Sequence, residues 1–286
     1  MNQQAKQTHP ENDVTWLIDA VSRMLRPIVR LAIGRISCNA LVALIRAIYV
    51  AEARAYLESQ NPERRVTRSA LALLCGMDGR AIQQYEEAND KDYSAADLCS
   101  EAAILDLWQS DQDFIEPDTG QPRELLVHGP QGTFQRLVSR AAGRAVTAQT
   151  ALDRLLDSGN VALNDDGTQV RMVEKYFYLV PDSEQAALEA GSLSLNRLGK
   201  ALNHNIGRDP RTPSWLQQDR WTLRVPLEGL DDFRAQVRAL LFKHIEQVEQ
   251  RLDEQERQQK AGPLCAVGIG WYYWEDSSPG EPTASL

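Results

Sequence analysis

Apolar residues spaced three or four positions apart predict an amphipathic helix near the start of the chain. The residues that form this pattern are Trp16, Leu17, Val21, Met24 and Leu25. Pro27 interrupts the pattern, as expected of a residue that removes a backbone donor, and the apolar spacing resumes after it. A second, longer helix is predicted over residues 39–58, with Leu41, Leu44, Ile45, Ile48 and Tyr49 on one face.

Residues 66–85 have the pattern of a helix-turn-helix. Ala72 is small, as required where a second helix crosses close to the first. Gly76 stands where the turn needs a positive φ, and Ile82 supplies an apolar side chain to the shared core. Such a pair commonly places a helix in the major groove of DNA, although a helical hairpin with a glycine at its corner has the same pattern.

Polar residues at the starts of the two helices favour the same interpretation. Thr67 is predicted to be the N-cap of the first helix and Asp78 that of the second, because their side-chain oxygens can accept from free backbone N–H groups.

An acidic helix is predicted over residues 94–109, and a β-hairpin over 113–127 with its turn at 117–120. Helices followed by a hairpin make a winged helix. We therefore expect this hairpin to be the wing of the first unit.

The same order of elements recurs in the next part of the chain. Helices over 134–142 and 148–158, then short strands over 161–163 and 170–173, predict a second winged helix. The expected caps and the residue that stops the second helix are Thr133, Thr147 and Gly159.

The order of predicted helices and strands changes after residue 182. A helix over 183–205, a strand over 221–225, a long helix over 230–259 and a strand over 265–274 predict a small α/β lobe. The apolar stripe of the long helix either packs on this lobe or pairs with a second copy of the chain. The aromatic run 271–274 suits core packing, a ligand pocket or a dimer interface.

These patterns predict a mainly α protein with small β elements (α+β). It is expected to contain tandem winged helix-turn-helix units and a C-terminal strand–long helix–strand lobe. The predicted domains are 1–127, with the N-terminal helices and the first unit, 128–182, with the second, and 183–286, with a disordered tail from about 277.

Charge changes this picture only locally. The net charge is −9, but residues 86–118 alone carry −10, with eleven acids and one base. The rest of the chain is close to neutral, so a DNA-binding face is possible only as a local patch. The acidic segment 86–118 is interpreted as a solvated helix face, or as a surface that repels DNA or docks a basic protein partner.

No stretch reaches the roughly 20 apolar residues that a membrane helix needs, and the polar N-terminus lacks a signal-peptide core. Cys38, Cys75, Cys99 and Cys265 are scattered and are expected to be buried free thiols. We therefore expect a cytoplasmic protein that does not engage membranes.

Motifs of catalysis and metal binding are missing. The chain has no phosphate-binding glycine loop, no zinc-type spacing of histidines and cysteines, and no Gly-x-Ser-x-Gly. We expect no enzyme, no cofactor and no metal. His204 is the only residue that we keep as a candidate for a functional site. The alternative interpretation is that it belongs to the region that caps the C-terminal end of a helix.

Several segments resemble an uncharacterised bacterial family of helix-turn-helix proteins of similar length. They are 25–31, 66–69, 108–115, 120–122, 152–161 and 268–273. The resemblance implies this fold and carries no activity with it.

We therefore expect a dimeric transcriptional regulator that binds double-stranded DNA, with residues 79–87 and 147–154 facing the grooves. Arginines would contact phosphates or guanine, and glutamines would pair with adenine edges. Glu86 and Glu87 would oppose the DNA backbone. The residues expected to contact DNA are Arg64, Arg65, Arg68, Arg80, Gln83, Gln84, Arg136, Arg140, Arg144, Thr147, Gln149, Thr150 and Arg154.

Two alternatives remain open. Tandem winged helices also occur as acidic adaptors that bind a protein partner, as in condensin-associated subunits, and the pI near 5.1 suits that class. A repressor that senses a small ligand through its C-terminal lobe is the second.

Overall fold

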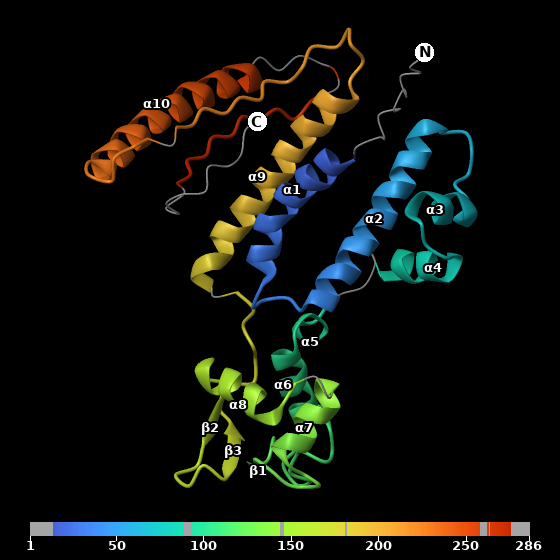
Figure 1. The fold of residues 1–286 in the computed structure, drawn as a ribbon, viewed down its shortest axis with the longest axis vertical. Coiled ribbons are helices and arrows are strands. Elements are labelled where there is room, and N and C mark those ends of the chain that lie inside the picture. The colour runs from blue at the N-terminus through green and yellow to red at the C-terminus, as the bar shows by residue number, and fades with distance from the viewer. Residues whose placement is uncertain are drawn as a thin grey trace, which may run out of the picture. The chain divides into compact units, whose positions relative to one another are not determined.

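The computed structural model describes residues 14–88, 93–143, 146–180, 182–222, 224–257, 262 and 264–275. The chain divides into two compact units, one up to Asp182 and one from Ser183 onward. It is mainly helical with one small three-stranded antiparallel sheet, which places it in the α+β class (Figure 1).

The first two helices are α1 (Thr15–Ala32) and α2 (Cys38–Gln60). The expected interruption at Pro27 is wrong, because α1 continues through this residue. The helix is largely exposed, so water can reach the carbonyl that proline leaves without a donor. The chain turns instead near Gly34, whose φ is 79°, and Ser37 caps α2 by accepting from the Ala40 N–H at 3.2 Å.

Two short helices, α3 (Arg68–Cys75) and α4 (Gly79–Ala88), pack against α2 and against each other. Their common core is small and fully apolar, and its buried members are Val50, Ala53, Leu71 and Ile82. The predicted core position of Ile82 is thus confirmed.

The local signals of this helix pair are also confirmed. Thr67 Oγ1 accepts from the Ala70 N–H at 3.2 Å, and Gly76 adopts a left-handed conformation with φ 64°. Asp78 Oδ1 accepts from the backbone N–H groups of Arg80 and Ala81 at 2.8 and 2.9 Å. Each of these signals acts over four residues or fewer, so the sequence alone could identify them.

The next part of the chain forms a larger cluster. Its elements are α5 (Ala95–Leu98), α6 (Ser100–Ser110), β1 (Leu125–Leu126), α7 (Phe134–Ala141), α8 (Ala148–Asp157), β2 (Val161–Leu163) and β3 (Gln169–Met172). The strands lie in the order β1-β3-β2, with Leu125 opposite Val170 and Val161 opposite Met172. Thr133 and Thr147 cap α7 and α8 as predicted.

The predicted wing of the first unit is wrong. A tight turn does form where expected, with the Glu116 N–H donating to the Gln121 carbonyl at 2.8 Å. However, β1 pairs with β3, so the segment belongs to the later cluster. The boundary predicted at residue 127 therefore falls inside one hydrophobic core, which runs from Ile104 to Val170.

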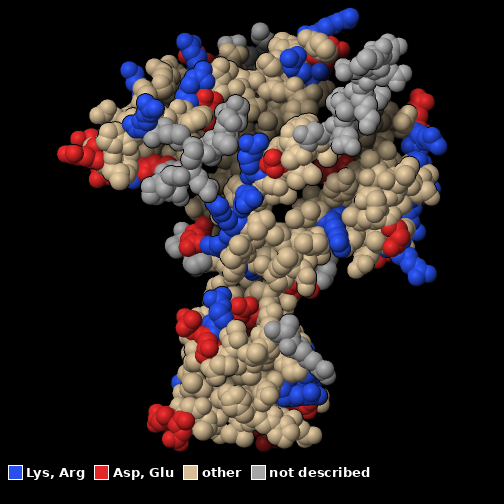
Figure 2. All heavy atoms as spheres, viewed as in Figure 1, with Lys and Arg blue, Asp and Glu red and all other residues tan. Residues whose placement is uncertain are grey.

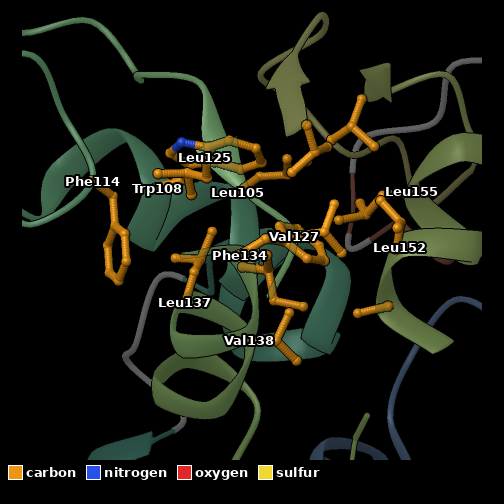
Figure 3. Packing of buried hydrophobic residues seen from close by; sticks show 14 residues of the cluster. Leu105, Trp108, Phe114, Leu125, Val127, Phe134, Leu137, Val138, Leu152 and Leu155 are labelled. Atoms are coloured by element: carbon orange, nitrogen blue, oxygen red, sulfur yellow. The ribbon is translucent and has the colours of Figure 1, made fainter. Parts of the chain in front are cut away.

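Trp108 is the largest fully buried side chain of this core (Figure 3). Its ring is fully buried, with its centroid 5.8 Å from that of Phe134. Its indole Nε1 donates to the carbonyl of Arg123 at 3.1 Å, just before β1. A buried tryptophan thus keeps its polar atom satisfied while its ring joins α6 to α7.

The expectation of four buried thiols is wrong for two of them. All four cysteines are free, and Cys99 is buried, but Cys38 and Cys265 are exposed. Burial raises the pKa of the Cys99 thiol, which disfavours the thiolate.

The second unit contains α9 (Asp182–Gly207) and α10 (Leu230–Arg257). The strands predicted at 221–225 and 265–274 are absent from the described residues of those segments. The prediction of a C-terminal α/β lobe is therefore wrong, because the described residues of this unit form helices and no strand. A strand needs a neighbour for its backbone hydrogen bonds, and neither segment has one among the described residues. The predicted tail from 277 lies outside the described residues.

An ion-pair cluster holds residues 273–275 to the start of α10. Arg234 donates to both carboxylate oxygens of Glu275, at 2.7 and 2.6 Å, and to Asp231 at 2.6 Å. Tyr273 donates its hydroxyl to Glu275 at 2.7 Å. The Arg234 guanidinium, followed by the Tyr273 hydroxyl, lowers the pKa of Glu275 to about 2.

Replacing Trp108 with alanine is expected to lower the free energy of unfolding by about 3–5 kcal/mol, because it leaves a cavity in place of a fully buried side chain. Urea unfolding followed by circular dichroism measures this loss. Trp16→Ala, at a position 67% exposed, is the matched control and is expected to change stability by less than about 0.5 kcal/mol. Equal effects of the two substitutions would contradict the central role of Trp108.

The attachment of residues 273–275 to α10 is expected to depend on acid pH. A carboxyl whose pKa is lowered on folding stabilises the folded form above its ordinary pKa, here 4.5. That contribution is lost as the pH falls toward the folded value of about 2. An NMR titration of the Glu275 carboxyl checks this, with Glu275→Gln to assign the signal, and a midpoint near 4.5 would show that the cluster does not form.

Candidate nucleic-acid interface

An open groove lies on the exposed side of the α3–α4 pair. The residues that line it are Arg68, Asp78, Gly79, Arg80, Ala81, Gln83 and Gln84. Four of the residues predicted to contact DNA are thus brought to one surface.

The first two turns of α4 present a single polar face. Arg80, Gln83 and Gln84 are exposed and stand three and four residues apart, so they lie on the same side of the helix. Asp78 shares the groove, but its carboxylate already accepts two backbone hydrogen bonds at the start of α4.

Four arginines surround this helix pair. Arg64, Arg65, Arg68 and Arg80 are all exposed. Within the part of the chain that the structure describes, none of them forms an ion pair. Their guanidinium groups are therefore available to an anionic ligand.

The two acids that end α4 are held by neighbouring side chains. Glu86 forms an ion pair with Arg54 of α2, and Glu87 accepts a hydrogen bond from Gln83 at 2.9 Å. The sequence alone predicts that the negative charge of Glu86 repels the DNA backbone. In the structure, the positive charge of Arg54 offsets that charge. The two partners lie 32 positions apart in the sequence, so no local pattern indicates this pair.

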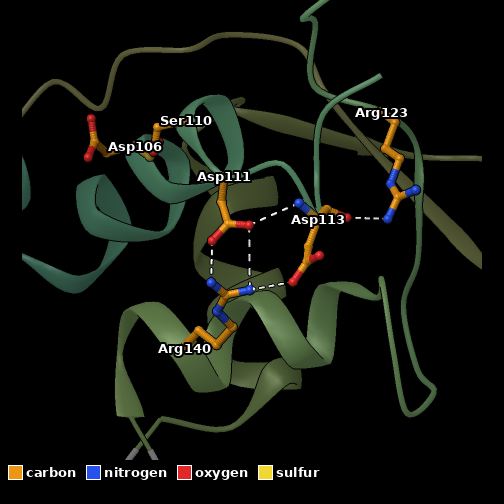
Figure 4. Close-up of polar contacts among 6 residues, drawn as sticks. All are labelled: Asp106, Ser110, Asp111, Asp113, Arg123 and Arg140. Carbon is orange, nitrogen blue, oxygen red and sulfur yellow. Dashed lines mark hydrogen bonds and ion pairs between the residues drawn. The ribbon is translucent and has the colours of Figure 1, made fainter. Parts of the chain in front are cut away.

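Arg140, predicted to contact phosphates, is engaged within the protein (Figure 4). It forms ion pairs with Asp111 and with Asp113, the latter at 2.7 Å. Its guanidinium carbon also lies 5.4 Å from the centroid of the Phe114 ring. The figure shows Arg140 reaching from α7 across to the loop that follows α6. These contacts give Arg140 a structural role.

The predicted residues of α8 are largely engaged as well. Arg154 pairs with Glu101 at 3.3 Å, and Gln149 donates to Asp153 at 2.7 Å. Thr147 caps the helix and lies 2.8 Å from the hydroxyl of Thr150. Gln149 and Thr150 remain exposed at the start of α8.

Arg136 is the remaining described arginine of the second predicted set, and it is exposed with no ion pair to any described residue. Arg144 lies outside the described residues. The structure thus separates the two predicted surfaces, with available arginines around α3 and α4 and mostly engaged ones around α7 and α8.

The acidic segment 86–118 supplies most of these internal partners. Glu86, Glu101, Asp111 and Asp113 each form an ion pair, and Asp97 accepts from the Ser94 N–H at 3.0 Å. Over the face drawn in Figure 2, basic and acidic residues are interspersed. Much of the acidic segment therefore stabilises the fold.

His204, the histidine singled out in the sequence, lies in the last turn of α9. Its ring stacks on Trp215 with 4.1 Å between centroids, and Nε2 lies 3.2 Å from the carbonyl oxygen of Pro213. The described residues contain no group of three or more His, Cys, Asp or Glu side chains placed to hold a metal ion.

Comparison with known families confirms that the chain belongs to an uncharacterised family. The model of a family of unknown function, DUF6502, matches residues 14–281. The chain belongs to DUF6502. The DUF6502 match covers both units and all thirteen residues predicted to contact DNA. A search of curated proteins found no match. None of the helices in the described residues has the length and apolar character needed to cross a membrane.

Replacing Arg140 with alanine is expected to lower the free energy of unfolding by about 1–2 kcal/mol, because Asp111 and Asp113 lose their shared cation. Arg136→Ala on the same helix is the matched control, with an expected change below about 0.5 kcal/mol. Urea unfolding of both variants makes the comparison. If Arg140→Ala proved as mild as Arg136→Ala, the ion pairs would not contribute to stability.

Proposed function

We propose that this protein is a transcriptional regulator that binds double-stranded DNA, with α4 in the major groove. The observation that carries this proposal is the surface around α3 and α4. It combines an open groove, exposed glutamines and four exposed arginines that no described acid engages.

Each group on this surface has a chemical role in the proposal. Arg64, Arg65 and Arg68 come before or at the start of α3, where they would contact phosphates and set the position of the helix pair. Gln83 and Gln84 project from α4, and a glutamine amide can pair with the N6 and N7 edge of adenine. Arg80, one turn earlier, has the bidentate geometry that guanine requires.

The later cluster supports the proposal through its order of elements. Helix α6, strand β1, helices α7 and α8, and the β2–β3 hairpin follow one another as they do in winged-helix domains. In that arrangement the start of α8 would face DNA through Gln149 and Thr150, with Arg136 on the phosphates. Its contribution would be smaller than that of α4, since Arg140 and Arg154 are engaged in ion pairs.

Replacing both Arg64 and Arg68 with alanine is expected to weaken binding to random-sequence duplex DNA and to make it less sensitive to salt. Each phosphate contact contributes about 0.9 to the slope of log K against log salt, so losing two should lower the slope by about 1.8. Fluorescence anisotropy with a labelled duplex at several NaCl concentrations measures both quantities.

The double variant Arg197→Ala/Lys200→Ala removes the same charge from exposed positions of α9. It is expected to bind like the wild type. If both double variants lost the same DNA affinity, Arg64 and Arg68 would not be the residues that contact the phosphates. Failure of the folded wild type to bind duplex at low salt would refute the proposal.

A further inference from the structure

The described residues of the second unit form no buried interior. None of its described side chains is buried, although α9 and α10 together span 54 residues. Ordering a residue costs about 1–2 kcal/mol of backbone entropy, and burial of apolar surface is the main compensation. The unit therefore needs another surface to cover its apolar residues.

Apolar side chains are exposed on α10 and on the segment 264–274. The exposed members are Phe233, Leu240, Phe242, Leu264, Val267, Ile269, Trp271, Tyr272, Tyr273 and Trp274. On α10 they lie beside or on the stripe of Val237, Leu241, Ile245, Val248 and Leu252, which is only half-buried. The aromatic segment is also rich in residues that favour strands, but it pairs with no strand among the residues that the structure describes.

The charges of α10 indicate what covers this surface. Residues 230–243 carry two acids and three bases, a net charge of +1, whereas 244–257 carry five acids and two bases, a net charge of −3. Two copies side by side in the same direction would bring the acidic halves together. Two copies in opposite directions would pair unlike halves.

We propose that α10 pairs in antiparallel orientation with α10 of a second copy of this chain, and that the segment 264–274 completes the interface. With the two-fold axis near residue 244, Leu240 lies opposite Val248 of the partner subunit. On one flank of the stripe Arg238 lies opposite Glu249 of the partner subunit, and symmetry forms this pair twice.

Arg238 and Glu249 cannot form an ion pair with each other within one helix. They lie eleven residues apart, about 16 Å along the axis. Neither forms an ion pair with any described residue of its own chain. Because eleven residues are close to three full turns, both lie on the same flank of α10, as an antiparallel pair requires.

The size of the surface shows why the aromatic segment must contribute. A helix of 28 residues is about 42 Å long and about 10 Å wide, so pairing α10 alone would bury roughly 800 Å² over both copies. Stable interfaces bury about 1,200–2,000 Å². The bonds of Glu275 to Arg234 hold the end of the segment 264–274 at the first turn of α10, where it can extend the same interface.

Sedimentation equilibrium of the full chain tests the proposal. The wild type is expected to be a dimer. Arg238→Glu and Glu249→Arg each create two like-charged pairs and should each raise the dissociation constant by roughly tenfold or more. The double variant Arg238→Glu/Glu249→Arg restores unlike charges in the reversed sense and should return to within about threefold of the wild type.

Arg197→Glu, an exposed position of α9, is the matched control and should leave the dimer intact. Circular dichroism of each variant confirms that it is folded. A monomeric wild type, or single variants that dimerise like the wild type, would overturn the proposal, and so would a double variant as weak as the singles. The measurement contains no DNA, so its outcome is separate from that of the proposed function.

Discussion

The packing of α6, α7 and β1 depends on the burial of Trp108. Its ring joins α6 to α7, and its Nε1 fixes the backbone just before β1 by donating to Arg123. This contact brings β1 to the edge of β3, although more than forty residues separate the two strands. The loop between α6 and β1 is thereby held beside α7, where Asp111 and Asp113 meet Arg140.

That packing also distributes the charge. The acids of the segment 86–118 meet arginines of α2, α7 and α8, so a region with a net charge of −10 is partly neutralised by distant partners. The arginines of α3 and α4 have no such partners among the described residues. A total charge of −9 therefore coexists with a local surface that can accept an anion, since binding depends on the charges at the interface.

Sequence reasoning succeeded where the deciding interaction is short in range. The caps at Thr67, Asp78, Thr133 and Thr147 and the turn at Gly76 each involve atoms within a few residues, so residue type and spacing were enough. It failed at Pro27, because the free-energy cost of a proline inside a helix depends on whether water can reach the backbone carbonyl that loses its donor. It also failed at the strands 221–225 and 265–274, because strand propensity does not provide a pairing partner.

The sequence by itself determined where most helices lie, the caps at Thr67, Asp78, Thr133 and Thr147, the turn at Gly76 and the β2–β3 hairpin, because backbone hydrogen bonds and side-chain caps close over short loops. Tertiary structure alone decided that β1 joins the later cluster. It also decided that Arg140 and Arg154 are engaged while Arg68 and Arg80 are available. These outcomes depend on which distant side chains share a core or a surface, and residue spacing does not encode that information.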